Sequence, residues 1–490
     1  MKPAIALLLL LVLALDLADA NASGADYTVT IDADKPHVAS VTARFTPMDD
    51  RLFMFPGAQQ LERRWATFVS DLQVSASDGS EIGAQETPGG SWVLEAVPED
   101  EVTVSYRVTL DHEDHHWSSG IDGAAYARNW GVFYTGRSLF IANGEDRNGI
   151  TVSFELPAGW QVTTPWQALN DTDPQFAIAD HTELGESMLF AGQHRSLVVD
   201  EGDFELRLAL GGENVTANER AYVDTATGVL DYYVELMGGI PRLRSADGVS
   251  RSVVIISEDE NVDGEVIGNN ISMLLNPEGD PMMQVMGQLI FAHEFFHLWN
   301  GKSIVPASED TEWFKEGFSN YYTLKALLRV GALDESTFLD VLSGFFYQRY
   351  RGDSGVGTLS MSDGSLKHDH WGLVYAGGLF AAICQDLLIR DATNNERSID
   401  QMMRSMFVDF ADDNYTLDDI KHRLGALAGS SQEQFFARHI TGVEELPIAE
   451  HLALAGIDVV TNEGQTGFRV SETSTLEQDA IRRAMFGTDQ

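Results

Sequence analysis

Two histidines four positions apart, His293 and His297, are the residues whose types and spacing best support chemistry. In a helix, residues four apart lie one turn apart on the same face, so both imidazoles can converge on one ion. Glu294 follows the first histidine, which would put its carboxylate beside an open coordination position. This HExxH pattern predicts a zinc ion with a general base for hydrolysis.

A third ligand follows in the chain. Glu316 lies 19 positions after His297, in a helix-like segment expected at about 310–329. HExxH followed by a glutamate at this spacing resembles the ligand pattern of the gluzincin metallopeptidases. We therefore predict one Zn²⁺ per chain, held by His293, His297 and Glu316, with Glu294 as the base.

The helix that carries the histidines is predicted to be buried. Asp280-Pro281 is typical of a helix start, Gly301 supplies a stop, and the residues between them leave almost no polar face. Imidazoles and a carboxylate in such surroundings are costly unless an ion pairs them, which favours zinc over a chance match. One turn beyond Glu316, Asn320 is a candidate to orient a ligand imidazole, with a surface asparagine as the alternative.

Composition bounds the class of protein. The chain has 490 residues, of which 44% are hydrophobic, and a formal net charge of −43. Its length suits about two to four globular domains. The negative charge argues against nucleic acid or an anionic membrane as a partner. Cys384 is the only cysteine, so no intramolecular disulfide can form.

The first twenty residues are typical of a secretory signal. Lys2 precedes the apolar run Ala4 to Leu15, and Ala18-Asp19-Ala20 follows as a cleavage site. A membrane anchor is the alternative, but this run is too short to span a bilayer, and no other stretch is expected to be long enough. We predict an exported, soluble mature chain, either periplasmic or extracellular.

Residues 25–212 alternate between apolar and polar, as in Val102–Leu110, which predicts an antiparallel β-sandwich. Further strands are expected at Tyr27–Ile31, Val38–Phe45, Ile150–Leu156 and Phe204–Leu210. A helix is expected at about 218–236, strands at 252–257 and 270–275, and mostly helices from there to about 455. The predicted division is a signal peptide (1–20), a sandwich (25–212), a catalytic domain (213–345), a helical domain (346–460) and a polar tail (461–490) with one short helix.

These residues resemble the glycyl-aminopeptidase-like metallopeptidases, peptidase family M61. The similar segments are His293 to Asn300 with Lys302 and Pro306, Trp313 to Phe318 with Tyr321-Tyr322, Tyr375 to Gly378, Phe435-Phe436, Gly442 to Pro447 and, more faintly, Phe55 to Gly57 with Trp65 to Val69. The resemblance implies an α+β multidomain fold: an N-terminal antiparallel β-sandwich, a thermolysin-like zinc-peptidase catalytic domain and a C-terminal helical domain. It also makes Tyr375 the candidate to stabilise the oxyanion.

The chain departs from this family in two places. Members often continue into a PDZ domain, for which the residues after Val460 are too few. The family's acidic segment before the metal helix, which in related aminopeptidases holds the substrate amine, is neutral here. Asn269 and Asn270 occupy it as candidate substrate-binding residues, and Glu265 is out of register, although it could act as a substitute carboxylate.

The sequence thus predicts a secreted zinc metallopeptidase that acts on peptide or protein substrates. It leaves open whether the enzyme is an aminopeptidase or an endopeptidase, with internal cleavage slightly favoured. Strand 270–275 is expected to pair with an extended substrate along its edge. A secreted protein that binds peptides without cutting them, on a metallopeptidase fold, is the alternative function.

Overall fold

The computed structural model describes residues 24–109, 123–170, 172–201, 203–243, 248–279, 281–462 and 465–487. The predicted signal peptide and the predicted helix-capping residue Asp280 lie outside these residues. The chain forms two compact units. The sheet unit comprises Met1–Asp111, Arg137–Pro157 and Gln167–Gly185, and the site unit comprises His112–Gly136, Ala158–Trp166 and Glu186–Gln490.

The sheet unit contains an eight-stranded sheet and a three-stranded sheet. The larger sheet has the order β13 (Gln167–Ala168), β14 (Gln175–Asp180), β11 (Asn148–Glu155), β1 (Ala25–Ile31), β2 (Val38–Phe45), β8 (Val102–Thr109), β4 (Val69–Ala76) and β5 (Glu81–Ile82), and the smaller has β3 (Arg51–Phe53), β7 (Ser91–Leu94) and β6 (Ala84–Thr87). Alternation along β8 buries Val102, Val104, Tyr106 and Val108, as predicted. The prediction of a purely antiparallel arrangement is wrong, because β1 and β11 run parallel.

In addition to the two-stranded pairs β21 (Val305–Pro306) with β22 (Asn414–Tyr415) and β23 (Ile457–Asn462) with β24 (Gln465–Val470), the site unit contains two larger sheets. One has the order β12 (Gln161–Thr163), β15 (Met188–Gly192), β10 (Gly131–Thr135) and β9 (Tyr126–Arg128), and the other has β16 (Arg195–Glu201), β17 (Phe204–Gly211), β18 (Ser250–Glu258), β20 (Asn270–Leu275) and β19 (Asp263–Ile267). Strand β17 was expected in the sandwich, but it pairs in parallel with β18. The predicted boundary at residue 212 therefore cuts through a group of elements that pack together.

The helices belong mainly to the site unit. They are α3 (Glu213–Ala217), α4 (Glu219–Met237), α5 (Pro281–Phe296), α6 (Glu312–Arg329), α7 (Glu335–Val341), α8 (Gln348–Gly352), α9 (Gly377–Ala392), α10 (Ile399–Asp409), α11 (Leu417–Ala428), α12 (Glu433–Phe435), α13 (Ile448–Leu452) and α14 (Leu476–Phe486), with α1 (Gly136–Leu139) and α2 (His181–Gly185) earlier in the chain. Two π-helical turns, Leu342–Tyr347 and Gly372–Ala376, precede α8 and α9.

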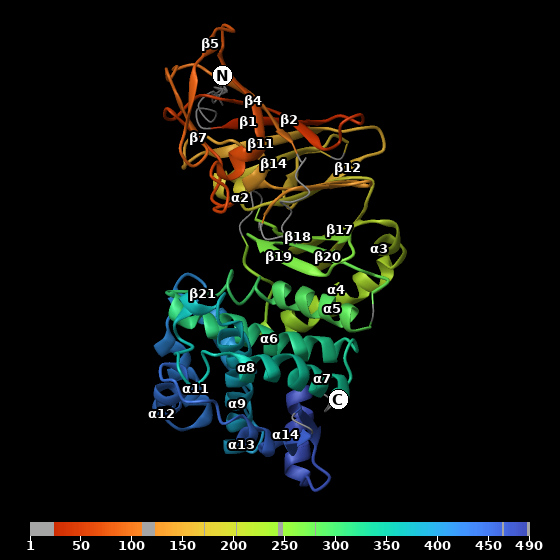
Figure 1. Ribbon diagram of the computed structural model, residues 1–490, viewed down its shortest axis with the longest axis vertical. Coiled ribbons are helices and arrows are strands. Elements are labelled where there is room, and N and C mark those ends of the chain that lie inside the picture. Colours follow the sequence, from red (N-terminus) through yellow and green to blue (C-terminus); the bar gives the residue numbers. More distant parts are fainter. Residues whose placement is uncertain are drawn as a thin grey trace, which may run out of the picture. The chain divides into compact units, whose positions relative to one another are not determined.

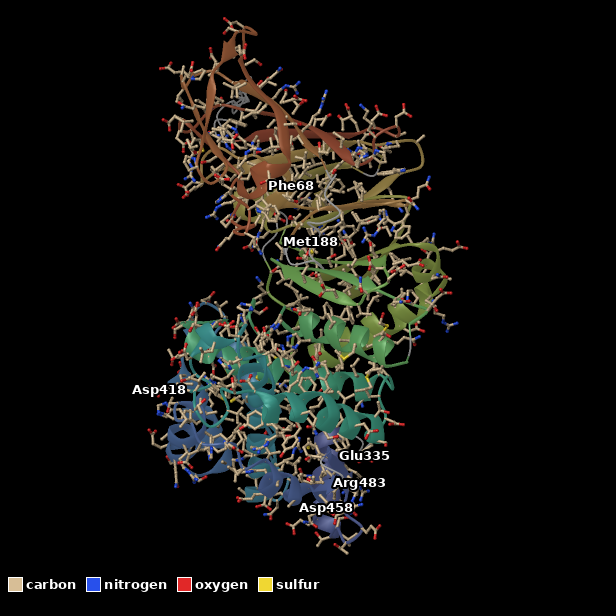
Figure 2. All side chains as sticks on the ribbon, viewed as in Figure 1. Phe68, Met188, Glu335, Asp418, Asp458 and Arg483 are labelled. Atoms are coloured by element: carbon tan, nitrogen blue, oxygen red, sulfur yellow. The ribbon has the colours of Figure 1, made fainter. Side chains whose placement is uncertain are left out.

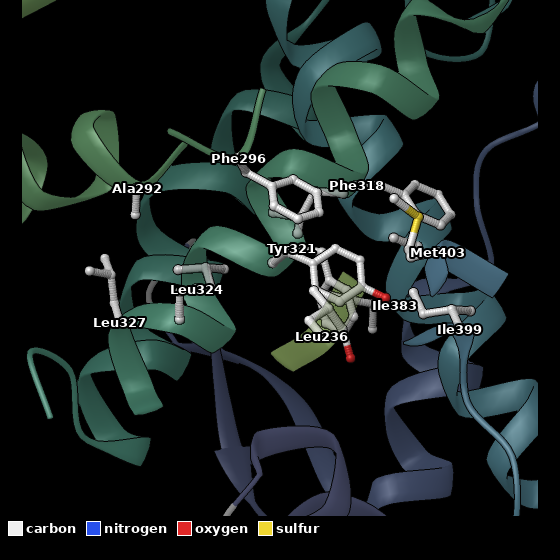
Figure 3. Close-up of a cluster of buried hydrophobic side chains, with 14 of the residues drawn as sticks. Leu236, Ala292, Phe296, Phe318, Tyr321, Leu324, Leu327, Ile383, Ile399 and Met403 are labelled. Atoms are coloured by element: carbon white, nitrogen blue, oxygen red, sulfur yellow. The ribbon is translucent and has the colours of Figure 1, made fainter. Parts of the chain in front are cut away.

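The five-stranded sheet is covered on both faces. Residues such as Val254 and Ile256 pack with helices α4 and α5, and their neighbours Val253 and Ile255 pack with the four-stranded sheet. The ribbon shows α4 and α5 beside β18 and β20 (Figure 1). Both faces are apolar because these parallel strands are buried on each side. Below this layer, α5, α6, α9 and α10 share one core, in which Phe296, Phe318, Tyr321, Ile383 and Met403 lie close together (Figure 3).

The last residues do not form a polar tail as predicted. They form a hairpin of β23 (Ile457–Asn462) and β24 (Gln465–Val470), followed by α14. Phe468, Ile481 and Met485 are buried in the core of the site unit, which explains why the segment is ordered. Polar composition conceals these few apolar anchors. Charged residues such as Asp418 and Asp458 stand at the surface, and carboxylates of this kind give the chain its negative charge (Figure 2).

One segment of the described chain, Gly372–Ala392, is long and apolar enough to cross a membrane by length and composition. The expectation that no stretch after the signal would reach that length is therefore wrong. Most of this segment is buried inside the site unit, as in the core helix of a soluble protein.

Candidate active site

Helix α5 and the turn after it hold the two histidines. His293 and Glu294 lie in the last turn of α5, which ends at Phe296, earlier than the predicted stop at Gly301. The backbone amide of His297 donates to the Glu294 carbonyl, three residues back, so the chain tightens there. The other end of the helix is less buried than predicted, because Met282 is 58% exposed and contacts solvent instead of a core.

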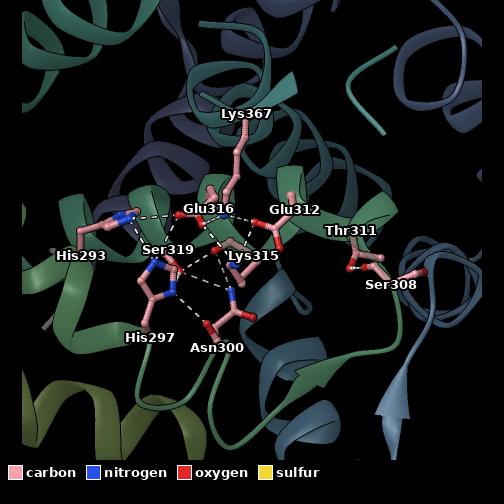
Figure 4. Close-up of polar contacts among 10 residues, drawn as sticks. All are labelled: His293, His297, Asn300, Ser308, Thr311, Glu312, Lys315, Glu316, Ser319 and Lys367. Atoms are coloured by element: carbon pink, nitrogen blue, oxygen red, sulfur yellow. Dashed lines mark hydrogen bonds and ion pairs between the residues drawn. The ribbon is translucent and has the colours of Figure 1, made fainter. Parts of the chain in front are cut away.

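Helix α6 brings the third group to the histidines, as predicted. Glu316 Oε2 lies 3.3 Å from His293 Nε2 and 3.2 Å from His297 Nε2 (Figure 4). The two Nε2 atoms are 3.1 Å apart. These three residues form the one His, Cys, Asp and Glu group among the described residues whose ligand atoms converge on a common point.

A backbone carbonyl orients one of the imidazoles. His297 Nδ1 lies 2.9 Å from the carbonyl oxygen of Asn300, so Nδ1 carries the proton and Nε2 presents its lone pair. The Asn300 side chain in turn donates to the Lys315 carbonyl at 3.1 Å, which ties this turn to α6.

The orienting role predicted for Asn320 is not borne out by this geometry. Asn320 is buried, so the surface alternative is wrong too. Within the described part of the chain, its amide nitrogen has no hydrogen-bond partner, and His297 Nδ1 donates to the Asn300 carbonyl instead. The turn after α5, and not α6, supplies the carbonyl that orients His297.

The donor set fits a zinc ion. Two imidazole nitrogens and one carboxylate oxygen are a ligand set that zinc accepts, and three ligands leave a position for substrate. Three acceptor atoms within 3.3 Å of one another repel unless a cation or a proton lies between them. The residues present therefore fit the metal that the sequence predicts.

Charge and burial set the protonation of the two glutamates. Burial raises the pKa of Glu316, but the imidazoles of His297 and His293 outweigh burial and hold that pKa well below its usual range. For Glu294, burial is the largest cause and the charge on Glu316 adds to it, so its pKa rises to about 7 in spite of the nearby His293. One carboxylate is thus kept ionised while the other can exchange a proton near neutral pH.

Tyr375 lies on a π-helical turn, Gly372–Ala376, that ends directly before α9. Such turns occur often at functional sites. The tyrosine ring stacks on Trp371 at 5.2 Å and lies 6.3 Å from the His293 ring, centroid to centroid. Burial, with the charges of Glu316 and Glu294, raises the pKa of Tyr375, so its hydroxyl stays protonated.

Two glycines set the spacing between helix α6, which carries Glu316, and helix α9, which follows Tyr375. A Cβ on Gly317 would lie 2.1 Å from the backbone of Gly378, and one on Gly378 would lie 2.0 Å from the Trp313 carbonyl oxygen. Helices α6 and α9 therefore touch backbone to backbone, one residue after Glu316 and three residues after Tyr375.

Strand β20 is not an edge of the five-stranded sheet, whose edge strands are β16 and β19. The predicted substrate-pairing strand 270–275 lies between β18 and β19 and has no free edge. Asn270 is buried: its amide oxygen accepts from the Val253 amide at 3.2 Å, and its nitrogen donates to the Glu186 carbonyl at 3.1 Å. The prediction of Asn270 as a substrate-binding residue is therefore corrected, since its side chain closes a turn. Asn269 lies in that turn, where its carbonyl accepts from Ser252.

Glu265 faces away from the metal helix. Its neighbour Gly264 lies so close to α5 that an added Cβ would meet Ile290 at 2.3 Å. Since side chains alternate along a strand, Glu265 and Ile267 point to the opposite face, and Ile267 packs with the four-stranded sheet. Glu265 accepts a hydrogen bond there from the Gly123 amide at 2.7 Å. The idea that it replaces the missing amine-binding carboxylate is not supported.

Three charged residues next to the site were not predicted. They are Glu312, Lys315 and Lys367, and each of the two lysines contacts both Glu312 and Glu316 (Figure 4). A signal was present for two of them, because Glu312, Lys315 and Glu316 share a face of a helix that otherwise looks buried. Lys367 is far away in the sequence, so only the fold could reveal it.

Comparison with known proteins gives the same family as the motif resemblance. The family model for the Peptidase M61 N-terminal domain matches residues 26–193, and that for M61 glycyl aminopeptidase matches residues 288–382. The second match includes both histidines, Glu294, Glu316 and Tyr375. No curated protein matches the chain.

A solved structure has the same fold. It is an aminopeptidase N family protein from Idiomarina loihiensis, with a TM-score of 0.76 at 19% identity over 91% of this chain and 82% of that chain. The two family matches describe successive parts of one kind of protein and together span more than half of the sequence. The chain therefore belongs to the M61 peptidase family.

Proposed function

We propose that this M61 peptidase is an exported zinc metallopeptidase that cleaves peptides, including bonds inside the chain. The observation that carries the proposal is the convergence of His293 Nε2, His297 Nε2 and Glu316 Oε2 beside Glu294. Zinc held by these atoms would polarise a peptide carbonyl and make water acidic enough to react near neutral pH. The protein's own residues supply the remaining chemistry.

Glu294 is the base in this proposal. Its carboxylate, with a pKa of about 7, takes a proton from the attacking water and returns it to the leaving amine. Tyr375 stabilises the oxyanion by donating a hydrogen bond from its hydroxyl. That hydroxyl makes no hydrogen bond to another described residue that would compete with substrate, whereas stacking on Trp371 holds the ring.

Internal cleavage is favoured over strict removal of the first residue. An aminopeptidase must pair a desolvated ammonium with a carboxylate or several acceptors. At the position where related aminopeptidases have this carboxylate, the turn between β19 and β20 carries the neutral residues Asn269 and Asn270. Glu265 lies on the face of the sheet that points away from α5. The edge strand β19 can still pair with an extended peptide through its backbone, which does not require a free amine.

A peptide-library digest read by mass spectrometry tests the proposal. Purified protein is expected to contain one zinc per chain and to cleave peptides, whereas Glu294→Gln should keep zinc and lose turnover. One peptide with a free and with an acetylated N-terminus should be cut at similar rates. Abolition of cleavage by acetylation would show an amine anchor and make the enzyme an aminopeptidase. Peptide cleavage by metal-free protein would overturn the zinc mechanism.

Export is proposed from the N-terminal residues alone. Fractionation of cells that express the full chain, with N-terminal sequencing, is expected to find protein outside the cytoplasm that begins after Ala20. An unprocessed cytoplasmic chain would contradict this part of the proposal.

A further inference from the structure

The two carboxylate oxygens of Glu316 have different partners. Oε2 faces the imidazoles of His293 and His297, as described above. Oε1 lies 3.4 Å from Lys315 Nζ and 3.7 Å from Lys367 Nζ (Figure 4). Imidazoles therefore contact one oxygen and ammonium groups contact the other.

Glu312 holds both lysines. Lys315 Nζ lies 2.8 Å from each Glu312 oxygen, and Lys367 Nζ lies 2.7 Å from Oε2 of the same residue. Together with Glu316, these residues form a quartet with two positive and two negative charges. The Glu312 side chain is 10% exposed and that of Lys367 is 23% exposed, so these pairs are largely shielded from water. Surface ion pairs, in contrast, are individually weak.

The quartet joins two distant segments. Glu312, Lys315 and Glu316 lie in the first turns of α6, whereas Lys367 follows the short helix Gly364–Leu366, in the segment that leads to Tyr375. An ion pair within one helix is common and needs no functional account. A second cation, delivered from another segment onto the same two carboxylates, is not explained by helix stability.

We propose that Glu312, Lys315 and Lys367 form a clamp that directs Oε2 alone of Glu316 to the metal site. The inference rests on the proposed zinc function. Without the lysines, the two oxygens would be equivalent and the carboxylate could rotate or offer both. Charge-assisted contacts to Oε1 remove that freedom, as second-shell groups do for metal ligands. Lys315 and Lys367 are positioning residues in this account.

Charge and geometry must be separated in a test. Removing one lysine alone loosens Glu316, but it also removes a positive charge that repels a metal cation. The double substitution Glu312→Gln/Lys367→Gln leaves the net charge unchanged and removes one arm of the clamp. Glu312→Gln/Lys315→Gln removes the other arm in the same neutral way. Lys421→Gln/Glu433→Gln is the matched control, because it neutralises an ion pair at 3.1 Å elsewhere in the same unit.

Zinc affinity is measured by competition with a chromophoric chelator, and the visible spectrum of Co²⁺-loaded protein reports ligand geometry. Both clamp variants are expected to bind zinc about 10- to 100-fold more weakly and to show an altered cobalt spectrum. The control should match wild type in both, and Lys367→Arg should restore most of the affinity. Thermal melts identify a variant that does not fold, and the zinc affinity of the other clamp variant then tests the proposal.

Wild-type affinity with an unchanged cobalt spectrum in either folded clamp variant would overturn the clamp while leaving the zinc peptidase intact. A wild-type protein that binds no zinc at all would instead overturn the proposed function, and the clamp with it.

Discussion

Helix α6 carries a buried polar network in each half, and the two networks differ in how their groups are paired. In the C-terminal half, Asp386 Oδ2 accepts from the Tyr321 hydroxyl at 2.6 Å and from Arg390 Nε at 2.9 Å, and Oδ1 accepts from the Ile399 amide at 3.1 Å. Lys325 pairs with Asp400 at 2.9 Å close by. Every one of these contacts joins a donor to an acceptor.

In the N-terminal half, three acceptors meet instead. Glu316 Oε2 and the two imidazole Nε2 atoms converge with too few protons to satisfy them, although Oε1 of the same glutamate has cationic partners. A fully paired network joins helices and needs nothing more. Converging acceptors need a cation or a proton between them, so incomplete pairing distinguishes this candidate binding site from the structural contacts on the same helix.

The largest effect is expected from removing one of the three converging acceptors. His297→Ala removes one of three ligands, so zinc and hydrolysis should both fall to background, while the thermal melt of the metal-free protein should change little. Elemental analysis and peptide turnover measure this. Retained zinc with full turnover would show that the acceptors do not form the metal site.

Breaking the fully paired network around Asp386 should lower stability and leave zinc binding unchanged. Asp386→Asn removes a buried charge and leaves Arg390 without it, so unfolding in urea should show a loss of about 3–5 kcal/mol. Zinc affinity of the folded variant should match wild type. If zinc affinity fell while stability stayed, the two networks would not be separable in function.

Tyr375→Phe tests whether the Tyr375 hydroxyl stabilises the oxyanion. The change keeps the ring that stacks on Trp371, so stability should be preserved, whereas kcat should fall by roughly 10²-fold with KM little changed. Tyr321→Phe is the matched control: it removes the hydroxyl that donates to Asp386, so it should lower stability and leave kcat unchanged. Equal kcat in Tyr375→Phe and wild type would remove Tyr375 from the mechanism.

The smallest effect distinguishes two asparagines beside the site. Asn300→Ala breaks the bond to the Lys315 carbonyl that steadies the turn orienting His297, so zinc affinity should fall about tenfold. Asn320→Ala removes an amide nitrogen without a partner among the described residues and should cost less than that. Chelator competition on both variants decides, and the reverse order would restore Asn320 as the orienting residue.

Local patterns predicted the parts of the fold that depend on near neighbours. Strand β20 was predicted to the residue, and helices α4 and α6 to within a few residues, because alternation and helical periodicity are recorded in consecutive positions. The grouping of both histidines with Glu316 followed from spacing in the same way.

What depended on distant partners could not be predicted. The parallel pairing of β1 with β11 joins segments more than a hundred residues apart. Lys367 reaches Glu312 only because distant segments pack together. Asn270 is of a residue type that often binds substrate, but both ends of its side-chain amide make hydrogen bonds within the protein. The short helix near the C-terminus was predicted and is α14, but the hairpin before it was not, because it depends on Phe468, whose burial requires the rest of the unit.

The contact between Gly317 and Gly378 limits how this peptidase can be engineered for heat resistance. Changing a helical glycine to alanine is a common stabilising substitution, worth about 0.4–1 kcal/mol, because it reduces the freedom of the unfolded chain. At these two glycines the added methyl would meet rigid backbone and push Glu316 away from Tyr375. Gly344 has nothing within 4 Å of an added Cβ, which makes it the better position for such a substitution.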